Sequence, residues 1–107
     1  MVDNEFNIKL IGFGNARKLD CKEKENWKNG ITNECHLAPE IFFNQSFHSQ
    51  QADLFASGIF LFVILSIFPP FYHAKQSDFY YKYILHNKEA KFWEIHSKSL
   101  EEYLNLD

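Results

Sequence analysis

Two kinds of chemistry are open to the reactive side chains of this 107-residue chain: metal binding and phosphorylation. Cys21, Cys35, His36 and the four other histidines are residue types that bind zinc, but their spacings fit none of the usual ligand patterns. We therefore expect no metal site. Thr32 is the only Ser, Thr or Tyr between positions 15 and 37, so it is the one hydroxyl of that polar stretch that could carry a phosphate.

Charge and composition exclude several classes of protein. Eleven basic and 14 acidic residues give a net charge of −3 without a basic cluster, so nucleic-acid binding has no electrostatic support. Two cysteines make no disulfide framework, and the polar start Met-Val-Asp-Asn-Glu is no secretory signal. Both observations favour an intracellular, cytoplasmic location. The length makes residues 1–107 one domain or part of one, and 46% hydrophobic residues suffice for a core.

The element that must hold any site in place is the stretch Ala52–Phe71. From Leu54 to Phe68 nearly every residue is apolar, and its two serines are nine apart, which puts them on opposite sides of a helix. A helix that is apolar all round is either the central rod of a domain or a membrane span. A span needs about 20 apolar residues, so we favour a buried central helix. Asp53 would cap its first turn, and Gly58 would allow another backbone to approach closely.

Shorter elements flank this helix. Phe6–Ile11 alternates apolar and polar side chains and runs into a glycine turn, which predicts a short strand. Ser77-Asp78 can cap a helix that ends near Asn87. Ser99 and Glu102 have the spacing of a capping box, which predicts that a last amphipathic helix begins there. The expected fold class is mainly α, with a short N-terminal β segment and a buried central helix.

Four blocks, in this order, resemble the C-terminal lobe of a eukaryotic serine/threonine protein kinase. Ile8–Gly14, with the sequence I-K-L-I-G-F-G, is similar to the strand and magnesium loop that usually reads K-L-I-D-F-G. Ala38-Pro39-Glu40 matches the motif that closes the activation segment, and Pro39 suits the first turn of a short helix. Asp53–Gly58 and the apolar run resemble the family's F helix. Pro69–Phe71 matches the turn after it, and Asp78–Trp93 resembles a G helix of the calcium/calmodulin-dependent kinase group.

The resemblance implies ATP-dependent phosphorylation of protein Ser or Thr, but the chain departs from the family where that chemistry is carried. Gly12, Phe13 and Gly14 stand in place of D-F-G, and Gly12 has no side-chain oxygen to hold magnesium. The sequence contains no Gly-rich loop, no strand lysine for the phosphates and no H-R-D…N catalytic loop. We therefore expect a degenerate magnesium loop, no catalytic residue, and neither ATP nor magnesium as a cofactor of this chain.

The expected activation segment departs as well. Glu40 in the family pairs with an arginine of a later helix, whereas the one arginine here, Arg17, lies in the expected activation loop. The usual threonine position is occupied by Asn33, and Thr32 stands one residue earlier. Phosphate orders such loops by pairing with arginines. Because no arginine of a catalytic loop is present, we expect Thr32 to stay unmodified.

Three hypotheses about function stay open at this point. The chain is a partial protein kinase domain that is inactive alone, or a non-catalytic, pseudokinase-like interaction module, or a small membrane protein anchored by Leu54–Phe68. The module would hold a protein partner through the G-helix region or an exposed central helix. In the family the F helix is enclosed by helices before and after it, so a partial lobe should leave a large apolar patch uncovered.

Overall fold

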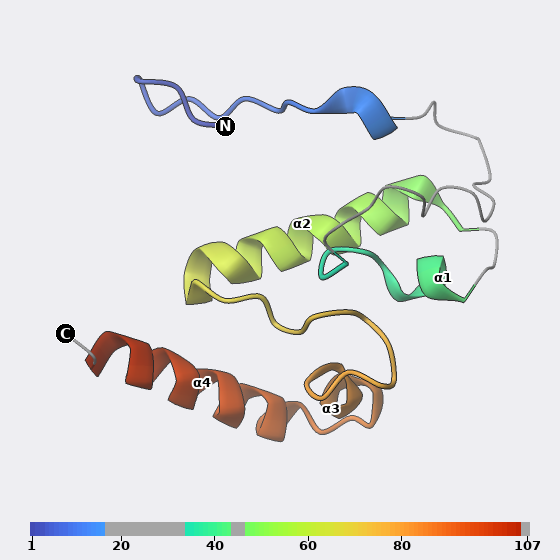
Figure 1. Cartoon of the computed structure of the whole chain (residues 1–107), viewed down its shortest axis with the longest axis vertical. Helices are drawn as coiled ribbons and strands as arrows, with labels where there is room; N and C mark the ends of the chain where they lie inside the picture. The colour runs from blue at the N-terminus through green and yellow to red at the C-terminus, as the bar shows by residue number, and fades with distance from the viewer. Residues whose placement is uncertain (17–33, 44–46, 106–107) are drawn as a thin grey trace.

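The computed structural model describes residues 1–16, 34–43 and 47–105 (Figure 1). Its elements, in chain order, are the 3-10 turn η1 (Phe13–Asn15) and the helices α1 (Pro39–Phe42), α2 (Ser49–Ser66), α3 (Tyr81–Leu85) and α4 (Glu89–Asn105). Helix α2 lies in the middle, with the N-terminal segment on one side and α3 and α4 on the other (Figure 1). The fold is therefore mainly α, as the sequence predicted.

The N-terminal segment does not form the strand predicted over Phe6–Ile11. Val2 and Ile8 instead make an isolated antiparallel bridge, and the Asp3 carboxylate accepts hydrogen bonds from the backbone N–H groups of Glu5 and Asn7, at 2.9 and 2.8 Å. A strand needs a neighbour to pair its backbone N–H and C=O groups. No strand lies beside this segment in the described part of the chain, so the alternation of apolar and polar side chains was insufficient to form the predicted strand.

The ends of α2 differ from those predicted. The helix begins at Ser49, after His48, so Asp53 lies one turn inside it and does not cap it. It ends after Ser66, where the N–H of Ile67 donates to the carbonyl of Val63 at 2.8 Å. Ile67 has φ 71°, in the left-handed region that helix ends usually fill with glycine. The double proline that follows cannot continue a helix, which explains this stop.

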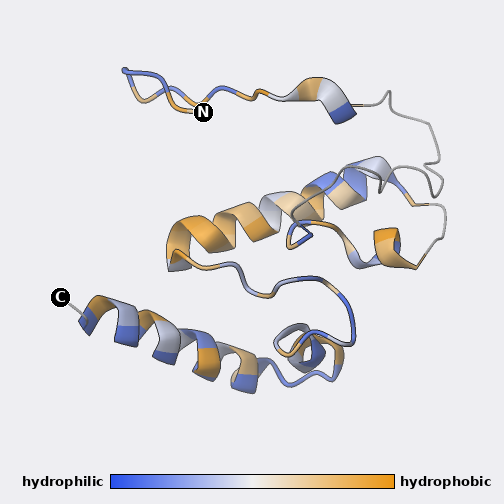
Figure 2. Cartoon of the chain, in the orientation of Figure 1, coloured by the Kyte–Doolittle hydropathy of each residue, from blue (hydrophilic) through white to orange (hydrophobic). Residues whose placement is uncertain are grey.

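The prediction of a buried central helix is wrong. Helix α2 is central in position, but only Ala52 and Ile59 are buried among its residues. Its other face carries Leu54, Leu61 and Leu65, which are 73%, 57% and 72% exposed. Figure 2 shows how strongly apolar the second half of α2 is. By length and composition this is the one helix of the described residues that could cross a membrane.

The core consists of two small clusters on the covered face of α2. The members of the first cluster, which joins α1 to the start of α2, are Leu37, Ala38, Ile41, Phe47 and Ala52. The members of the second, which joins the middle of α2 to α3, α4 and the loop before them, are Ile59, Phe71, Ala74, Tyr81 and Phe92. Phe42 and Phe55 pack against both clusters and so connect them.

The chain exposes more surface than a globular protein of its size. Its accessible area is 8723 Å², against about 6,200 Å² for a compact monomer of the same mass. Its radius of gyration is 16.0 Å, against about 13 Å for a compact domain of this length. Both values agree with a helix α2 that is covered on one face.

Helix α3 ends as the sequence predicted. Asn87 has φ 53°, its N–H donates to the carbonyl of Ile84 at 3.2 Å, and the N–H of Lys88 donates to that of Tyr83 at 2.7 Å. This pair of hydrogen bonds is a Schellman motif, in which a left-handed residue closes the helix. The signal that ends the helix lies within a few residues of sequence, so a local pattern was sufficient to predict where α3 ends.

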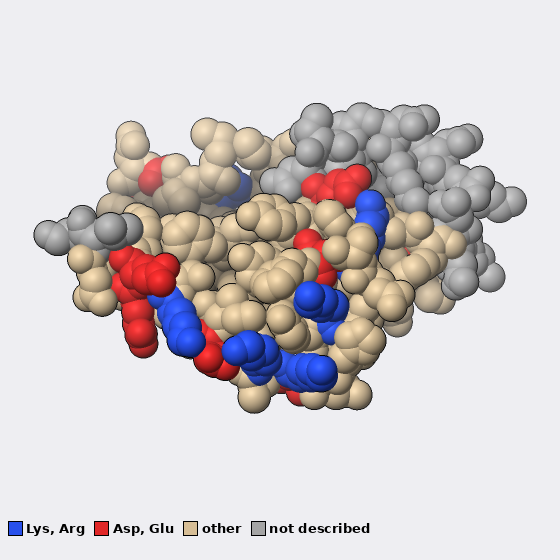
Figure 3. Space-filling model, turned by 60° about the horizontal axis from the view of Figure 1, so that its bottom comes forward, with Lys and Arg blue, Asp and Glu red and all other residues tan. Residues whose placement is uncertain are grey.

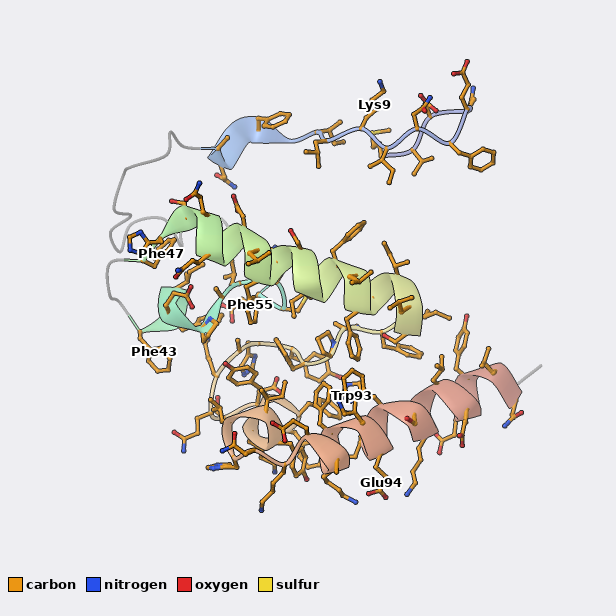
Figure 4. All side chains as sticks on the ribbon, turned by 180° about the vertical axis from the view of Figure 1, so that it is seen from behind. Lys9, Phe43, Phe47, Phe55, Trp93 and Glu94 are labelled. Atoms are coloured by element: carbon orange, nitrogen blue, oxygen red, sulfur yellow. The ribbon has the colours of Figure 1, made fainter. Side chains whose placement is uncertain are left out.

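Helix α4 begins ten residues earlier than predicted. It is continuous from Glu89, and Ser99 donates from its hydroxyl to the carbonyl of Ile95 at 3.1 Å within the helix, so the proposed capping box is wrong. Trp93 lies between α4 and α2, stacked on Phe62 with ring centroids 5.8 Å apart, whereas Glu94 points outward (Figure 4). The outer face of α4 carries acidic and basic side chains in alternation (Figure 3).

Candidate functional site

The glycine turn Gly12-Phe13-Gly14 is exposed. Gly12 has φ 80° and ψ 50°, a left-handed conformation that glycine adopts without strain. A Cβ added to Gly12 would meet no atom within 4 Å, and Phe13 is 69% exposed. No group of three or more His, Cys, Asp and Glu side chains gathers anywhere in residues 1–16, 34–43 and 47–105. Within the described part of the chain, the turn therefore offers its backbone and a phenyl ring, and no group of three ligand side chains lies beside them.

The motif Ala38-Pro39-Glu40 starts α1 and is packed against the core. Ala38 is 1% exposed, and Pro39 occupies the first turn as predicted. Glu40 is half-buried and forms no ion pair with any described residue. Burial raises the pKa of the Tyr81 phenol, and the negative charge of Glu40 raises it further. Glu40 therefore acts on a tyrosine of α3 here, while Arg17 lies outside the described residues.

Lys75 connects α1 to the loop between α2 and α3. Its Nζ lies 3.2 Å from the Glu34 carboxylate and 4.2 Å from the ring centroid of Phe42. Glu34 precedes the A-P-E motif and Phe42 follows it, so one side chain contacts both flanks of the motif. The ion pair is largely exposed and contributes about 0–1 kcal/mol, so its role is to position α1 rather than to stabilise the fold.

Asp53 and Gly58, the two site residues predicted on α2, lie on its uncovered face. Asp53 is exposed, and its backbone carbonyl accepts a hydrogen bond from the Ser57 hydroxyl at 2.8 Å. A Cβ on Gly58 would meet no atom within 4 Å, so the predicted close approach of another backbone does not occur among the described residues. The two residues share this face with Leu54 and Leu61.

Asp78 organises the loop before α3 more extensively than the sequence indicated. Its carboxylate is 3% exposed. One oxygen accepts hydrogen bonds from the N–H groups of Tyr80 and Tyr81, at 2.9 and 3.0 Å. Helix α3 begins at Tyr81 with Tyr80 as its N-cap, so Asp78 holds the turn before the helix and is not the predicted cap. The other oxygen accepts from Tyr72 and His73, at 3.0 and 3.2 Å. Sequence reasoning missed this second pair, because a loop that folds back has no local signal.

Of the remaining predicted residues, those that the structure describes do not form a site. Thr32 and Cys21 lie outside the described residues. Cys35 is partly exposed, and its sulfur lies 3.9 Å from Nδ1 of the adjacent His36. A distance of 3.9 Å is long for a hydrogen bond. Among the described residues, no third His, Cys, Asp or Glu side chain joins these two to form a metal site.

Residues 1–105 match the family model described as the protein kinase domain. The chain belongs to the protein kinase domain family. The match spans the glycine turn, the A-P-E motif, α2 and α4, and so includes the blocks on which the resemblance rested.

Several curated serine/threonine kinases are similar to this protein kinase domain fragment. The cAMP-dependent protein kinase catalytic subunit PRKX of Mus musculus is 38% identical over 82 residues, which are 77% of this chain and 22% of that protein. CBL-interacting protein kinase 2 of Oryza sativa subsp. japonica is 28% identical over 83 residues, 77% of this chain and 19% of that protein. The fragment thus spans about a fifth of the relatives' length. No solved structure matches it.

Proposed function

We propose that this chain is the part of a serine/threonine kinase C-terminal lobe that carries the end of the activation segment and its helical scaffold. The observation that supports this most strongly is the family match over residues 1–105. The A-P-E motif at the start of α1 and the D-L-F-A-S-G block in α2 fall within that match. The activity proposed for a longer protein that contains this part is ATP-dependent phosphorylation of protein Ser or Thr.

We also propose that the 107-residue chain alone does not transfer phosphate. Phosphoryl transfer depends on positioned phosphates, a base and magnesium ligands. The sequence holds no H-R-D…N loop and no strand lysine, and Gly12 stands at the D-F-G aspartate position. A left-handed glycine has no oxygen side chain for a cation that requires oxygen ligands. We therefore propose a degenerate magnesium loop without bound ATP.

Titration calorimetry of the 107-residue chain with ATP and magnesium tests this proposal. We expect no saturable heat. Micromolar binding would overturn the proposal, because about 8 kcal/mol would then have to come from a site without phosphate or metal ligands. Gly12→Asp should restore nothing in this chain, and should raise activity only in a longer protein that carries the missing motifs. Gly14→Asp is the matched control, since it adds the same charge to the same exposed turn.

A second candidate is a pseudokinase-like interaction module, which the uncovered face of α2 supports. Leu54, Leu61 and Leu65 are exposed on a helix whose opposite face is packed. Burying one such side chain contributes about 1.5–3 kcal/mol, so a partner that covers all three gains several kcal/mol. The region of α3 also presents Phe79 and Leu85, which are 54% and 46% exposed. We propose a cytoplasmic protein partner for these surfaces and no nucleic acid.

Size-exclusion chromatography with light scattering tests the module. We expect the chain to associate with itself or with a partner, and Leu65→Lys to reduce that association. Leu104→Lys is the matched control, because Leu104 is 60% exposed on α4, outside the α2 face. A monodisperse monomer that melts cooperatively without a partner would contradict the module. Retention in membranes after carbonate extraction would instead identify α2 as a membrane span.

A further inference from the structure

A cavity of about 380 Å³ lies where the C-terminal end of α2 and the loop after it meet α4. Its volume falls within the range of about 300–1,000 Å³ that small-molecule sites occupy. Aromatic rings form much of its wall, from Phe68, Phe71, Tyr72 and Tyr80. The cavity is separate from the glycine turn and from the A-P-E motif, so it takes no part in the function proposed above.

No carboxylate, ammonium or guanidinium group lines this cavity. The one titratable heterocycle in the lining, His96, has both ring nitrogens engaged with the backbone. Nε2 lies 2.8 Å from the carbonyl oxygen of Pro70, and Nδ1 lies 2.9 Å from that of Phe92. An ammonium group would leave water without a counter-charge, which is costly. The lining therefore selects against ligands that carry an ammonium group.

Two serine hydroxyls give the cavity hydrogen-bond acceptors. The Ser66 hydroxyl donates to the carbonyl of Phe62 at 2.6 Å, and the Ser99 hydroxyl donates to that of Ile95 at 3.1 Å. Each serine has a single proton, which these bonds use, while its oxygen keeps lone pairs. A ligand that donates a hydrogen bond can therefore be accepted by either oxygen.

We propose that this cavity binds an aromatic ring that carries a hydrogen-bond donor, such as a phenol or an indole. The rings already present meet edge-to-face, as Phe71 and Tyr81 do at 5.0 Å, and one more ring can pack against them in the same way. The hydroxyl or N–H of the ligand donates to Ser66 or Ser99. The ring belongs either to a free small molecule or to a Tyr or Trp side chain of another polypeptide.

The test titrates p-cresol into the uniformly 15N-labelled chain and follows the amide resonances of Ser66, Tyr72 and Ser99. We expect saturable shifts with a dissociation constant on the order of 1 mM, as for a ligand of this size. Benzylamine should bind at least tenfold more weakly. Benzylamine that binds more tightly than p-cresol, or the absence of saturable shifts, would overturn the proposal.

Variants of α4 separate the cavity from the exposed surface. Ser99→Leu fills the cavity and should weaken p-cresol binding at least tenfold. Ser97 is exposed, as Ser99 is, but lies outside the lining, so Ser97→Leu should leave binding unchanged. Ser99→Ala keeps the space and removes one acceptor. The affinity for p-cresol should therefore fall several-fold, whereas the affinity for toluene should not change. Equal losses of p-cresol affinity in Ser97→Leu and Ser99→Leu would contradict the assignment. An equal loss of affinity for toluene and p-cresol in Ser99→Ala would contradict it as well.

The same titration distinguishes the source of the ring. A Gly-Gly-Tyr-Gly-Gly peptide that binds as tightly as p-cresol supports a side chain of another polypeptide. A peptide at least tenfold weaker than p-cresol supports a free small molecule. Binding of both probes that persists unchanged in Ser99→Leu would place them outside the cavity and overturn the proposal. None of these readouts depends on ATP or on phosphoryl transfer.

Discussion

Replacing the buried carboxylate of Asp78 by an amide should destabilise the chain severely. Asp78 accepts four backbone hydrogen bonds, from Tyr72, His73, Tyr80 and Tyr81, through its two oxygens. Asparagine has the same shape but only one oxygen. In either orientation of the amide, two of these N–H groups would face an NH₂ group, which cannot accept from them.

The expected cost follows from the two lost hydrogen bonds. A hydrogen bond to a charged group contributes about 1.5–3 kcal/mol, so Asp78→Asn should lower the free energy of unfolding by about 3–6 kcal/mol. Domains are stable by about 5–15 kcal/mol, and the two small clusters of this chain place it at the lower end of that range. Asp78→Ala, which loses all four bonds, should cost more than Asp78→Asn.

Urea unfolding followed by far-UV circular dichroism measures this free energy, and amide exchange identifies the donors that are released. Exchange should rise at Tyr72 and His73, or at Tyr80 and Tyr81, depending on the orientation of the amide. Ser77→Ala is the control, since Ser77 is the exposed neighbour and should change stability by under about 0.5 kcal/mol. An Asp78→Asn chain within 1 kcal/mol of the parent would refute the reasoning.

Three further predictions concern single side chains. Ile67→Gly should stabilise the chain by about 0.5–1 kcal/mol and raise its melting temperature, because relief of left-handed strain outweighs the added freedom of the unfolded glycine; an unchanged or lower melting temperature would contradict this. Hydrogen bonds from Lys98 and Lys91 lower the pKa of Glu94 to about 2, so its contribution is present above the ordinary value of 4.5 and is lost as the pH falls toward 2. Circular dichroism of Glu94→Gln should therefore show less helix than the parent at pH 7 and equal helix at pH 2, and equal helix at both would count against the pairing. Burial and then Glu40 raise the pKa of Tyr81, so its contribution is present below about pH 10 and is lost as the pH rises further. Glu40→Gln should lower that pKa in an ultraviolet titration, and an unchanged pKa would show that the carboxylate does not act on the phenol.

The features that could be predicted from the sequence are those whose signal and structure lie within a few residues. Pro39 in the first turn of α1 and the stop at Asn87 are of this kind. The family was also recognisable, because its motifs recur in the right order along the chain.

The features that could not be predicted depend on distant partners. The alternation over Phe6–Ile11 is compatible with a strand, but a strand requires a second one beside it. The apolar composition of α2 alone did not show whether the chain covers this helix; the uncovered patch was expected only from the resemblance to the F helix, and the exposed Leu54, Leu61 and Leu65 confirm it. Ser99 and Glu102 have the spacing of a capping box, yet the turn before them is already helical.

The large exposed surface of the chain, to which the uncovered face of α2 and the N-terminal segment both contribute, has a consequence for the heat capacity of unfolding. An unfolded chain of this mass exposes about 18,400 Å², so folding buries about 9,700 Å² here, against about 12,200 Å² for a compact monomer. The heat capacity change and the denaturant slope both scale with the area exposed on unfolding. Each should be about four-fifths of the value for a compact domain of 107 residues. The stability of the chain should therefore vary less steeply with temperature and with urea, and its transitions should be broad.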